Sequence, residues 1–217
     1  MKTMKIKTLL FFLLCFSLKN LAFAQADTSS IPPFLGAEYL KNGTLVLRLS
    51  TGSSKIKALQ KLLNSPNTSP ANRQRYQTML DASEVAIQNQ NRWLVDAFRT
   101  NYRFSKLLLM PDTASTALKE GTRQGIFLND SLEVDPSITL QGNFLVAYYG
   151  QNTLPEYQHN EGINVLGPTL EPMHYPFPAF VGITGIRRTF NEIFNKRTDR
   201  EFFTELVMKF QKQLTEL

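Results

Sequence analysis

A run of hydroxyl residues, glycine and lysine is the segment of the sequence best suited to hold an anion. It lies between the predicted strand Thr44–Ser50 and the predicted helix Lys55–Leu63, and it consists of Thr51, Gly52, Ser53, Ser54 and Lys55. Free N–H groups and the positive end of the helix dipole attract anions at a helix N-terminus. The run lacks the second glycine and the Gly-Lys pair of a P-loop, which argues against nucleotide hydrolysis. The plainer interpretation is a turn in which Ser53 or Ser54 caps the helix.

Asp112 is the second candidate for ligand binding. It follows Lys106–Met110, a leucine-rich run without alternation that predicts a strand covered on both faces. Open α/β sheets bind ligands at the carboxyl ends of their strands, so Asp112 and the Thr51–Lys55 run are expected at one edge. The alternative is that Asp112 or Thr113 caps a short helix.

The two histidines raise the question of a metal site. Each follows a glutamate by three residues, in Glu156-x-x-His159 and Glu171-x-x-His174. On a helix this spacing places both side chains on one face, as in di-metal sites. Nearby helix breakers remove that geometry here; they are Pro155, Gly162, Pro168 and Pro172. We expect surface histidines, no metal ion and no cofactor, and a loop-built metal site that adds Glu161 is the alternative.

The other constellations that catalysis requires are missing from the sequence. Its one cysteine, Cys15, belongs to the N-terminal segment, which excludes a disulfide scaffold, a cysteine-based zinc site and a thiol nucleophile from the rest of the chain. No Gly-x-Ser-x-Gly elbow recruits a histidine. The sequence therefore leans against an enzyme, although a hydrolase or redox relic with unrecognised residues remains an alternative.

The first 24 residues have the order of charge and apolarity of a signal peptide. The apolar run Leu9–Phe16 is preceded by Lys2, Lys5 and Lys7 and followed by Ala22-Phe23-Ala24, which predicts cleavage before Gln25. The run is about 12 Å long as a helix, too short for a bilayer core of about 30 Å. We expect export to the periplasm, the cell surface or the medium, with no membrane span after cleavage. A retained N-terminal anchor and a lipid on Cys15 are the alternatives.

Charge is unevenly distributed along the chain. The 24 basic and 18 acidic residues give a net +6, but four of the lysines lie in residues 1–24. Residues 25–111 carry +6, residues 112–171 carry −6 and residues 172–217 carry +2. We expect the arginines of the first segment to lie against the acidic loops or in water. Steering toward an anionic partner is the alternative, and nucleic acid is disfavoured because no dense basic and aromatic patch exists.

Hydrophobic periodicity predicts an alternation of strands and helices. The predicted strands are Thr44–Ser50, Lys106–Met110, Ile126–Leu128, Phe144–Tyr149, a hairpin of Ile163–Leu166 with Leu170–His174, and Ala179–Ile183. The predicted helices are Lys55–Leu63, a long helix from Ser69-Pro70 to Asn101, Asp112–Lys119 and a C-terminal helix that begins with the capping box Thr198-x-x-Glu201. The polar middle of the long helix, residues 88–91, is expected to be exposed or bent.

This order predicts an α/β fold in a single domain, residues 41–217, after a flexible leader, residues 25–40. The mixed β-sheet is expected to be parallel in its N-terminal half, with an antiparallel hairpin late in the chain and helices on its flanks. A thioredoxin-like arrangement without Cys-x-x-Cys is the alternative.

The order of these features also resembles uncharacterised exported proteins of Bacteroidetes-type bacteria. The resemblance rests on the signal segment, the strand Thr44–Ser50, the long polar helix before Phe104–Met110, Gly125–Asn129 and Pro176–Phe180. It implies a periplasmic or surface location and supplies no binding or catalytic residues.

Together these features predict an exported, non-enzymatic envelope protein that binds another envelope component, either a protein or a polysaccharide. The alternative is a small anionic-ligand binder at the carboxyl edge of the sheet, near Thr51–Lys55 and Asp112. Composition does not set the oligomeric state.

Overall fold

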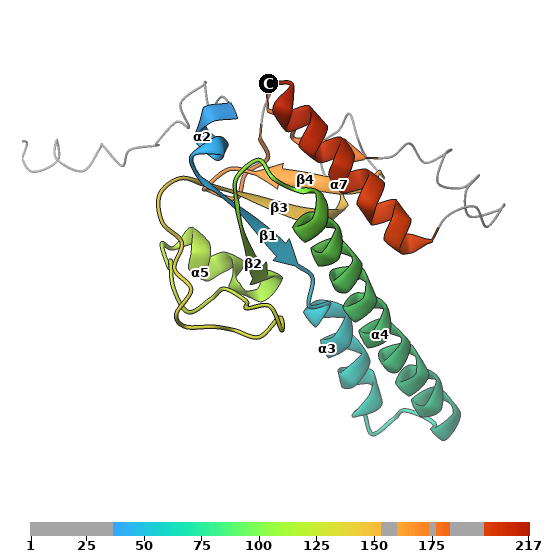
Figure 1. Ribbon diagram of the computed structural model, residues 1–217. Helices are drawn as coiled ribbons and strands as arrows, with labels where there is room; N and C mark the ends of the chain where they lie inside the picture. The colour runs from blue at the N-terminus through green and yellow to red at the C-terminus, as the bar shows by residue number, and fades with distance from the viewer. Residues whose placement is uncertain (1–36, 153–159, 174–176, 183–197) are drawn as a thin grey trace, which may run out of the picture. The chain divides into compact units, whose positions relative to one another are not determined.

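The computed structural model describes residues 37–152, 160–173, 177–182 and 198–217 (Figure 1). Its helices are α2 (Ala37–Lys41), α3 (Ser53–Leu63), α4 (Pro70–Asn101), the 3₁₀ turn η1 (Asp112–Ala114), α5 (Ser115–Lys119) and α7 (Asp199–Thr215). Its strands are β1 (Thr44–Leu49), β2 (Lys106–Pro111), β3 (Phe144–Gln151), β4 (Glu161–Leu166) and β5 (Phe180–Gly182).

The strands form one mixed sheet, which confirms the predicted fold class. Its order is β2-β1-β3-β4-β5, so β1 lies between β2 and β3, and β2 lies at one side of the sheet. β1 pairs in parallel with both β2 and β3, and the pairs β3–β4 and β4–β5 are antiparallel. The sheet is therefore parallel where the N-terminal strands lie and antiparallel where the late strands lie.

The crossover from β1 to β2 runs through α3 and α4, which pack against each other. α4 is 32 residues long, and it starts where the sequence predicts. The Ser69 side chain accepts a hydrogen bond from the Asn72 N–H at 3.3 Å, and Pro70 occupies the first helical position. Serine satisfies a free N–H group there, and proline has none to satisfy.

One face of the sheet is covered by α5 and the loop after it. Val46, Met110 and Val146 come from three adjacent strands and share a buried cluster with Leu118 of α5 and Phe127 of the loop. Side chains two residues apart along a strand share a face, so this face starts apolar and reaches Arg48 and Tyr148 further along β1 and β3.

The opposite face is covered by α4 and α7, which pack against each other. Tyr149 of β3 meets Phe203 of α7 edge to face, with ring centroids 4.9 Å apart. Phe98 of α4 meets Phe210 of α7 in a similar way at 6.0 Å. The predicted capping box of α7 is confirmed, because Thr198 and Glu201 exchange side-chain and backbone hydrogen bonds.

Two predicted strands differ from the structure. Ile126–Leu128 forms no strand, but Leu128 makes isolated antiparallel bridges to Leu109 and Val134. The principal antiparallel partners of β4 are β3 and β5. Among the described residues, the segment after Gly167 meets β4 at the Leu166–Pro172 bridge, where the Met173 N–H donates to the Val165 carbonyl at 3.0 Å. In both cases the strand assignment depends on which segments pair through their backbones, and local hydrophobic periodicity carries no information about that pairing.

Several predictions fall on residues outside the described ranges. These are the signal peptide, its cleavage before Gln25, most of the leader, and both histidines with Glu156. The helix α2 includes residues 37–40 of the predicted leader, and Leu40 is buried. Within the described residues, no helix combines the length and the apolarity that crossing a membrane requires.

Candidate functional site

The carboxyl ends of β1 and β2 bring two of the predicted site residues together. The last paired residues are Leu49 and Pro111, so the segments that follow them leave the sheet side by side. There the Thr51 hydroxyl donates a hydrogen bond to Asp112 Oδ1 at 2.6 Å. Because the two residues are 61 positions apart, this contact is a product of the parallel pairing of β1 with β2.

The capping role predicted for Asp112 is wrong. Neither η1 nor α5 has a side-chain hydrogen bond at its N-terminus. The Asp112 carboxylate faces Thr51, while the Asp112 carbonyl accepts a hydrogen bond from the Ser115 hydroxyl at 2.7 Å. The side chain is thus turned to the edge of the sheet, where a ligand would lie.

The turn from β1 into α3 depends on Gly52. This residue is the N-cap of α3 in the left-handed conformation, with φ of 61°, and no side chain caps the helix. The predicted cap by Ser53 or Ser54 is therefore wrong. The left-handed φ favours glycine here, and a Cβ atom on Gly52 would overlap Ile87 Cδ1, so the end of that α4 side chain would have to shift.

Asn91 holds the same turn from the other side. Its Nδ2 donates to the Ser50 carbonyl at 2.8 Å, and the Ser50 hydroxyl accepts from the Gly52 N–H at 3.2 Å. Asn91 Oδ1 is buried without a hydrogen-bond partner among the described residues. The polar middle of α4 therefore supports the turn at this point.

The remaining candidates of the run, Ser53, Ser54 and Lys55, lie in the first turn of α3. Ser54 and Lys55 are exposed and Ser53 is partly buried. The structure therefore brings Thr51 and Asp112 into contact but leaves Ser54 and Lys55 at the surface.

Arg48 is a site residue that the sequence interpretation missed. It lies opposite Tyr148 in the β1–β3 register, and its guanidinium carbon is 4.2 Å from the centroid of the Tyr148 ring. The side chain is partly buried, and its guanidinium makes no hydrogen bond to another described residue. Burial lowers the pKa of Arg48, while the charges of Tyr148 and Asp112 raise it. Arginine stays charged in proteins, so a cation with free donors lies at this edge.

Tyr148 completes the cluster on β3. Burial raises the pKa of its phenol, and the positive charge of Arg48 opposes that rise. The ring supports the guanidinium through a cation–π contact and leaves the edges of the guanidinium open. Arg48, Thr51, Asp112 and Tyr148 can together hold an anion. The described residues contain no group of three metal-binding side chains.

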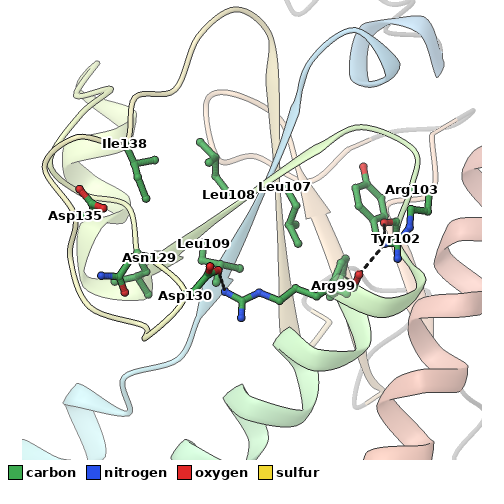
Figure 2. A pocket seen from close by; sticks show the side chains of 12 residues that line it. Arg99, Tyr102, Arg103, Leu107, Leu108, Leu109, Asn129, Asp130, Asp135 and Ile138 are labelled. Atoms are coloured by element: carbon green, nitrogen blue, oxygen red, sulfur yellow. Dashed lines mark hydrogen bonds and ion pairs between the residues drawn. The ribbon is translucent and has the colours of Figure 1, made fainter.

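A cavity of about 510 Å³ lies elsewhere, along the outer side of β2 (Figure 2). Three segments bound it: the end of α4, residues 107–109 of β2, and the loop 128–138. Its apolar lining residues are Phe98, Leu107, Leu108, Leu109, Leu128 and Ile138. Its polar lining residues are Arg99, Tyr102, Arg103, Asn129, Asp130 and Asp135.

The charged groups of this cavity already have partners. Arg99 extends from α4 toward Asp130 of the loop, with 2.7 Å between nitrogen and oxygen (Figure 2). This pair confirms for Arg99 the predicted contact between helix arginines and acidic loops. Arg103 Nη1 donates to the carbonyls of Arg99 and Tyr102 at the end of α4, both at 2.7 Å.

Two titratable groups of the cavity have shifted pKa values. Burial raises the pKa of Tyr102 far above its ordinary value, although a hydrogen bond with Ser105 opposes that rise. Hydrogen bonds from Ser137 lower the pKa of the exposed Asp135 carboxyl. Both shifts keep each group in its usual protonation state at neutral pH, so neither is poised for proton transfer.

Two signals in the sequence point to the missed residues. Arg48 is the only charged residue of β1, a strand whose other five residues are buried. Pro111 ends a strand that is otherwise leucine-rich, and proline is typical of edge strands. The first signal marks the cation at the carboxyl edge, and the second marks the free side of β2.

No protein-family model, curated protein or solved structure matches the chain. The resemblance to exported Bacteroidetes-type proteins and the thioredoxin-like alternative therefore stay predictions.

Proposed function

We propose that the protein is an exported, non-enzymatic binding protein that holds a carboxylate group of another envelope component at the carboxyl edge of β1, β2 and β3. The observation that carries the proposal is the guanidinium of Arg48. It is partly buried, stacked on Tyr148, and without an acceptor among the described residues. A buried or half-buried guanidinium normally has acceptors, so an open one is a place for an anionic partner.

The chemistry of Arg48 favours an oxyanion. Its planar fork of N–H donors matches two oxygens of a carboxylate, and partial burial strengthens that pairing compared with bulk water. The cation–π contact with Tyr148 fixes the plane of the guanidinium before the partner arrives, which lowers the entropy cost of binding.

Asp112 limits the charge that the site accepts. Its charge acts on Arg48 and compensates part of the positive charge at this edge. A singly charged carboxylate meets less repulsion from Asp112 than a doubly charged phosphate does. Uronic acids of a polysaccharide and acidic side chains of an envelope protein both supply such a carboxylate.

Export is the second part of the proposal, and it rests on the signal segment of residues 1–24. The test is the mass of the protein recovered from the periplasmic fraction of a bacterial host. We expect an N-terminus at Gln25. A chain that keeps Met1 and stays with the cytoplasm would contradict export and leave the binding site to be tested separately.

The binding test measures thermal stability and heats of titration with galacturonate, which carries a single charge, and with an oligogalacturonate, using inorganic phosphate for comparison. We expect both carboxylates to stabilise the protein by mass action and phosphate to stabilise it less. Arg48→Gln should abolish the effect, and Arg48→Lys should retain part of it because the charge remains. Arg73→Gln, an exposed change on α4, is the matched control.

A polymeric and a small carboxylate ligand give different results in this test. Tighter binding of the oligomer than of galacturonate supports an envelope polysaccharide. Equal binding supports the alternative of a small anionic ligand. If neither carboxylate binds, or if Arg48→Gln binds as well as the unmodified protein, the proposed site is wrong.

A further inference from the structure

The outer edge of β2 exposes backbone groups that the described residues do not pair. β2 is the first strand of the sheet, so only one of its sides meets another strand of the sheet, β1. On the other side, the Leu109 carbonyl accepts a hydrogen bond from the Leu128 N–H at 2.9 Å. Backbone groups of successive strand residues point to opposite sides and those two residues apart share a side, so the groups of Leu107 point outward as well. Pro111, which has no N–H, falls on the same outward side.

The Leu107 N–H and C=O have no hydrogen-bond partner among the described loops and turns. The loop comes close to pairing with them. Leu128 is antiparallel to Leu109, so a chain that continued straight would place its next-but-one residue opposite Leu107. Instead the chain turns away at Asn129, and the cavity of about 510 Å³ lies where that continuation would have been.

The turn at Asn129 is a fixed feature of the loop. The Asn129 side-chain carbonyl accepts hydrogen bonds from the Ser131 and Glu133 N–H groups at 2.9 and 3.1 Å. The Glu133 carbonyl accepts from the Asn129 N–H at 2.8 Å, and Leu132 takes a left-handed φ of 63°. These bonds hold the loop away from Leu107, so the cavity exists before any partner arrives.

We propose that this edge binds an extended peptide segment of a partner protein, which pairs with Leu107 as an added strand and places one apolar side chain in the cavity. A backbone donor and acceptor on one residue are complementary to a peptide backbone, as in β-strand addition. The apolar part of the cavity lining consists of leucine, isoleucine and phenylalanine residues. Its charges are two arginines and two aspartates, so they favour a neutral segment over an anion.

The test starts from a library of N-acetylated, C-amidated heptapeptides selected on the full protein as the host processes it. The best binder is then methylated at one backbone nitrogen at a time. We expect one methylation to weaken binding by about tenfold and its two neighbours to have little effect, because only alternate N–H groups face β2. Amide exchange at Leu107 should be fast in the free protein and slow with the peptide bound.

Two variants at one position separate backbone from side chain. Leu107→Pro removes the outward N–H without removing a hydrogen bond to β1, and we expect it to weaken peptide binding by about tenfold. Leu107→Ala keeps that N–H and loses only side-chain contact, so it should retain more of the affinity. If Leu107→Pro does not fold, the methylation series and the amide exchange of Leu107 still test the proposal.

Three results would overturn the proposal. One is the absence of any heptapeptide with Kd below about 1 mM. Another is a loss of affinity on methylation that does not alternate along the peptide backbone. The third is protection of Leu107 that rises with protein concentration alone, which would assign the edge to a second copy. Arg48→Gln should bind the peptide normally, so this test is independent of the carboxylate site.

Discussion

Two edges of one sheet offer binding sites of opposite character. At the carboxyl ends of β1 and β2, a cation with open donors lies beside a carboxylate and two hydroxyl-bearing side chains. Along the outer side of β2, the charges are already paired or turned to backbone carbonyls, and the open groups belong to the main chain. The first edge is suited to a charged group and the second to a neutral chain. At each edge, the hydrogen-bonding group that has no partner in the described part of the chain therefore indicates the class of binding partner better than the charged residues nearby do.

The largest effect that we expect from a single change is at the turn into α3. Gly52→Ala places a methyl group against Ile87 in a backbone conformation that alanine rarely adopts. Strain and overlap together should lower the free energy of unfolding by about 2 to 4 kcal/mol in urea denaturation. Gly142→Ala is the control, since Gly142 has a similar φ of 67° and open space for a Cβ. Equal losses in the two variants would show that contact with α4 is unimportant.

The contact between Thr51 and Asp112 should be the next largest effect. Thr51→Val keeps the shape of the side chain and removes the hydroxyl that the Asp112 carboxylate accepts from. We expect a loss of about 1 to 2 kcal/mol in unfolding free energy, because the hydrogen bond is partly buried and its acceptor is charged. Thr113→Val, at an exposed neighbouring position, is the control. An unchanged stability of Thr51→Val would mean that the contact does not order the site.

The pH titration of Tyr102, which is buried, and of Tyr148, which is partly buried, should distinguish the two edges. Burial raises the pKa of both Tyr102 and Tyr148, and only Tyr148 has a nearby arginine charge that opposes the rise. We expect Tyr148 to ionise before Tyr102 in NMR titrations of the phenol carbons. Arg48→Gln should raise the pKa of Tyr148 further and leave that of Tyr102 unchanged. The same pKa of Tyr148 in the unmodified protein and in Arg48→Gln would contradict the stacked geometry.

The same tyrosines set the direction of the stability change at high pH. Their folded pKa values lie above the unfolded value of about 10, so the neutral phenol stabilises the fold below that pH. As pH rises past about 10, the unfolded chain releases these protons first, and stability falls. Tyr102→Phe should make the fall shallower, which urea denaturation at a series of pH values measures.

The smallest effect should come from the ion pair at the β2 edge. The Asp130 side chain is 98% exposed and that of Arg99 is 38% exposed, and ion pairs in contact with water contribute little to stability. We expect a double-mutant cycle with Arg99→Ala and Asp130→Ala to show no measurable coupling at 0.15 M salt. A strong, salt-resistant coupling would mean that the pair holds the loop and that the cavity is not fixed by Asn129.

The position of each residue directly after a predicted strand made the first edge predictable, whereas pairing between distant segments hid the second. Thr51 and Asp112 each follow a strand, so the rule for parallel sheets placed both at one edge. Local signals also predicted helix caps at Ser53 and Asp112 that do not form. Gly52 is the N-cap of α3 instead, and the β1–β2 register places the Asp112 carboxylate against Thr51.

The β2 cavity needs three segments that the sequence separates, and no local pattern connects them. Three residues of the run Lys106–Met110, Leu108 to Met110, are buried, as its lack of alternation predicts, although β2 lies at the side of the sheet. Loop residues such as Phe127 cover one face of it. Burial and position in the sheet are separate properties, and hydrophobic pattern reports the first of them alone.

The central claim is that a carboxylate binds at Arg48. The most direct measurement is the side-chain Nε–H spectrum of arginine-labelled protein during titration with oligogalacturonate. We predict a saturable shift of the Arg48 signal, with the signals of Arg99 and Arg103 unchanged. A shift confined to Arg99 and Arg103, or no shift at any arginine, would contradict the account.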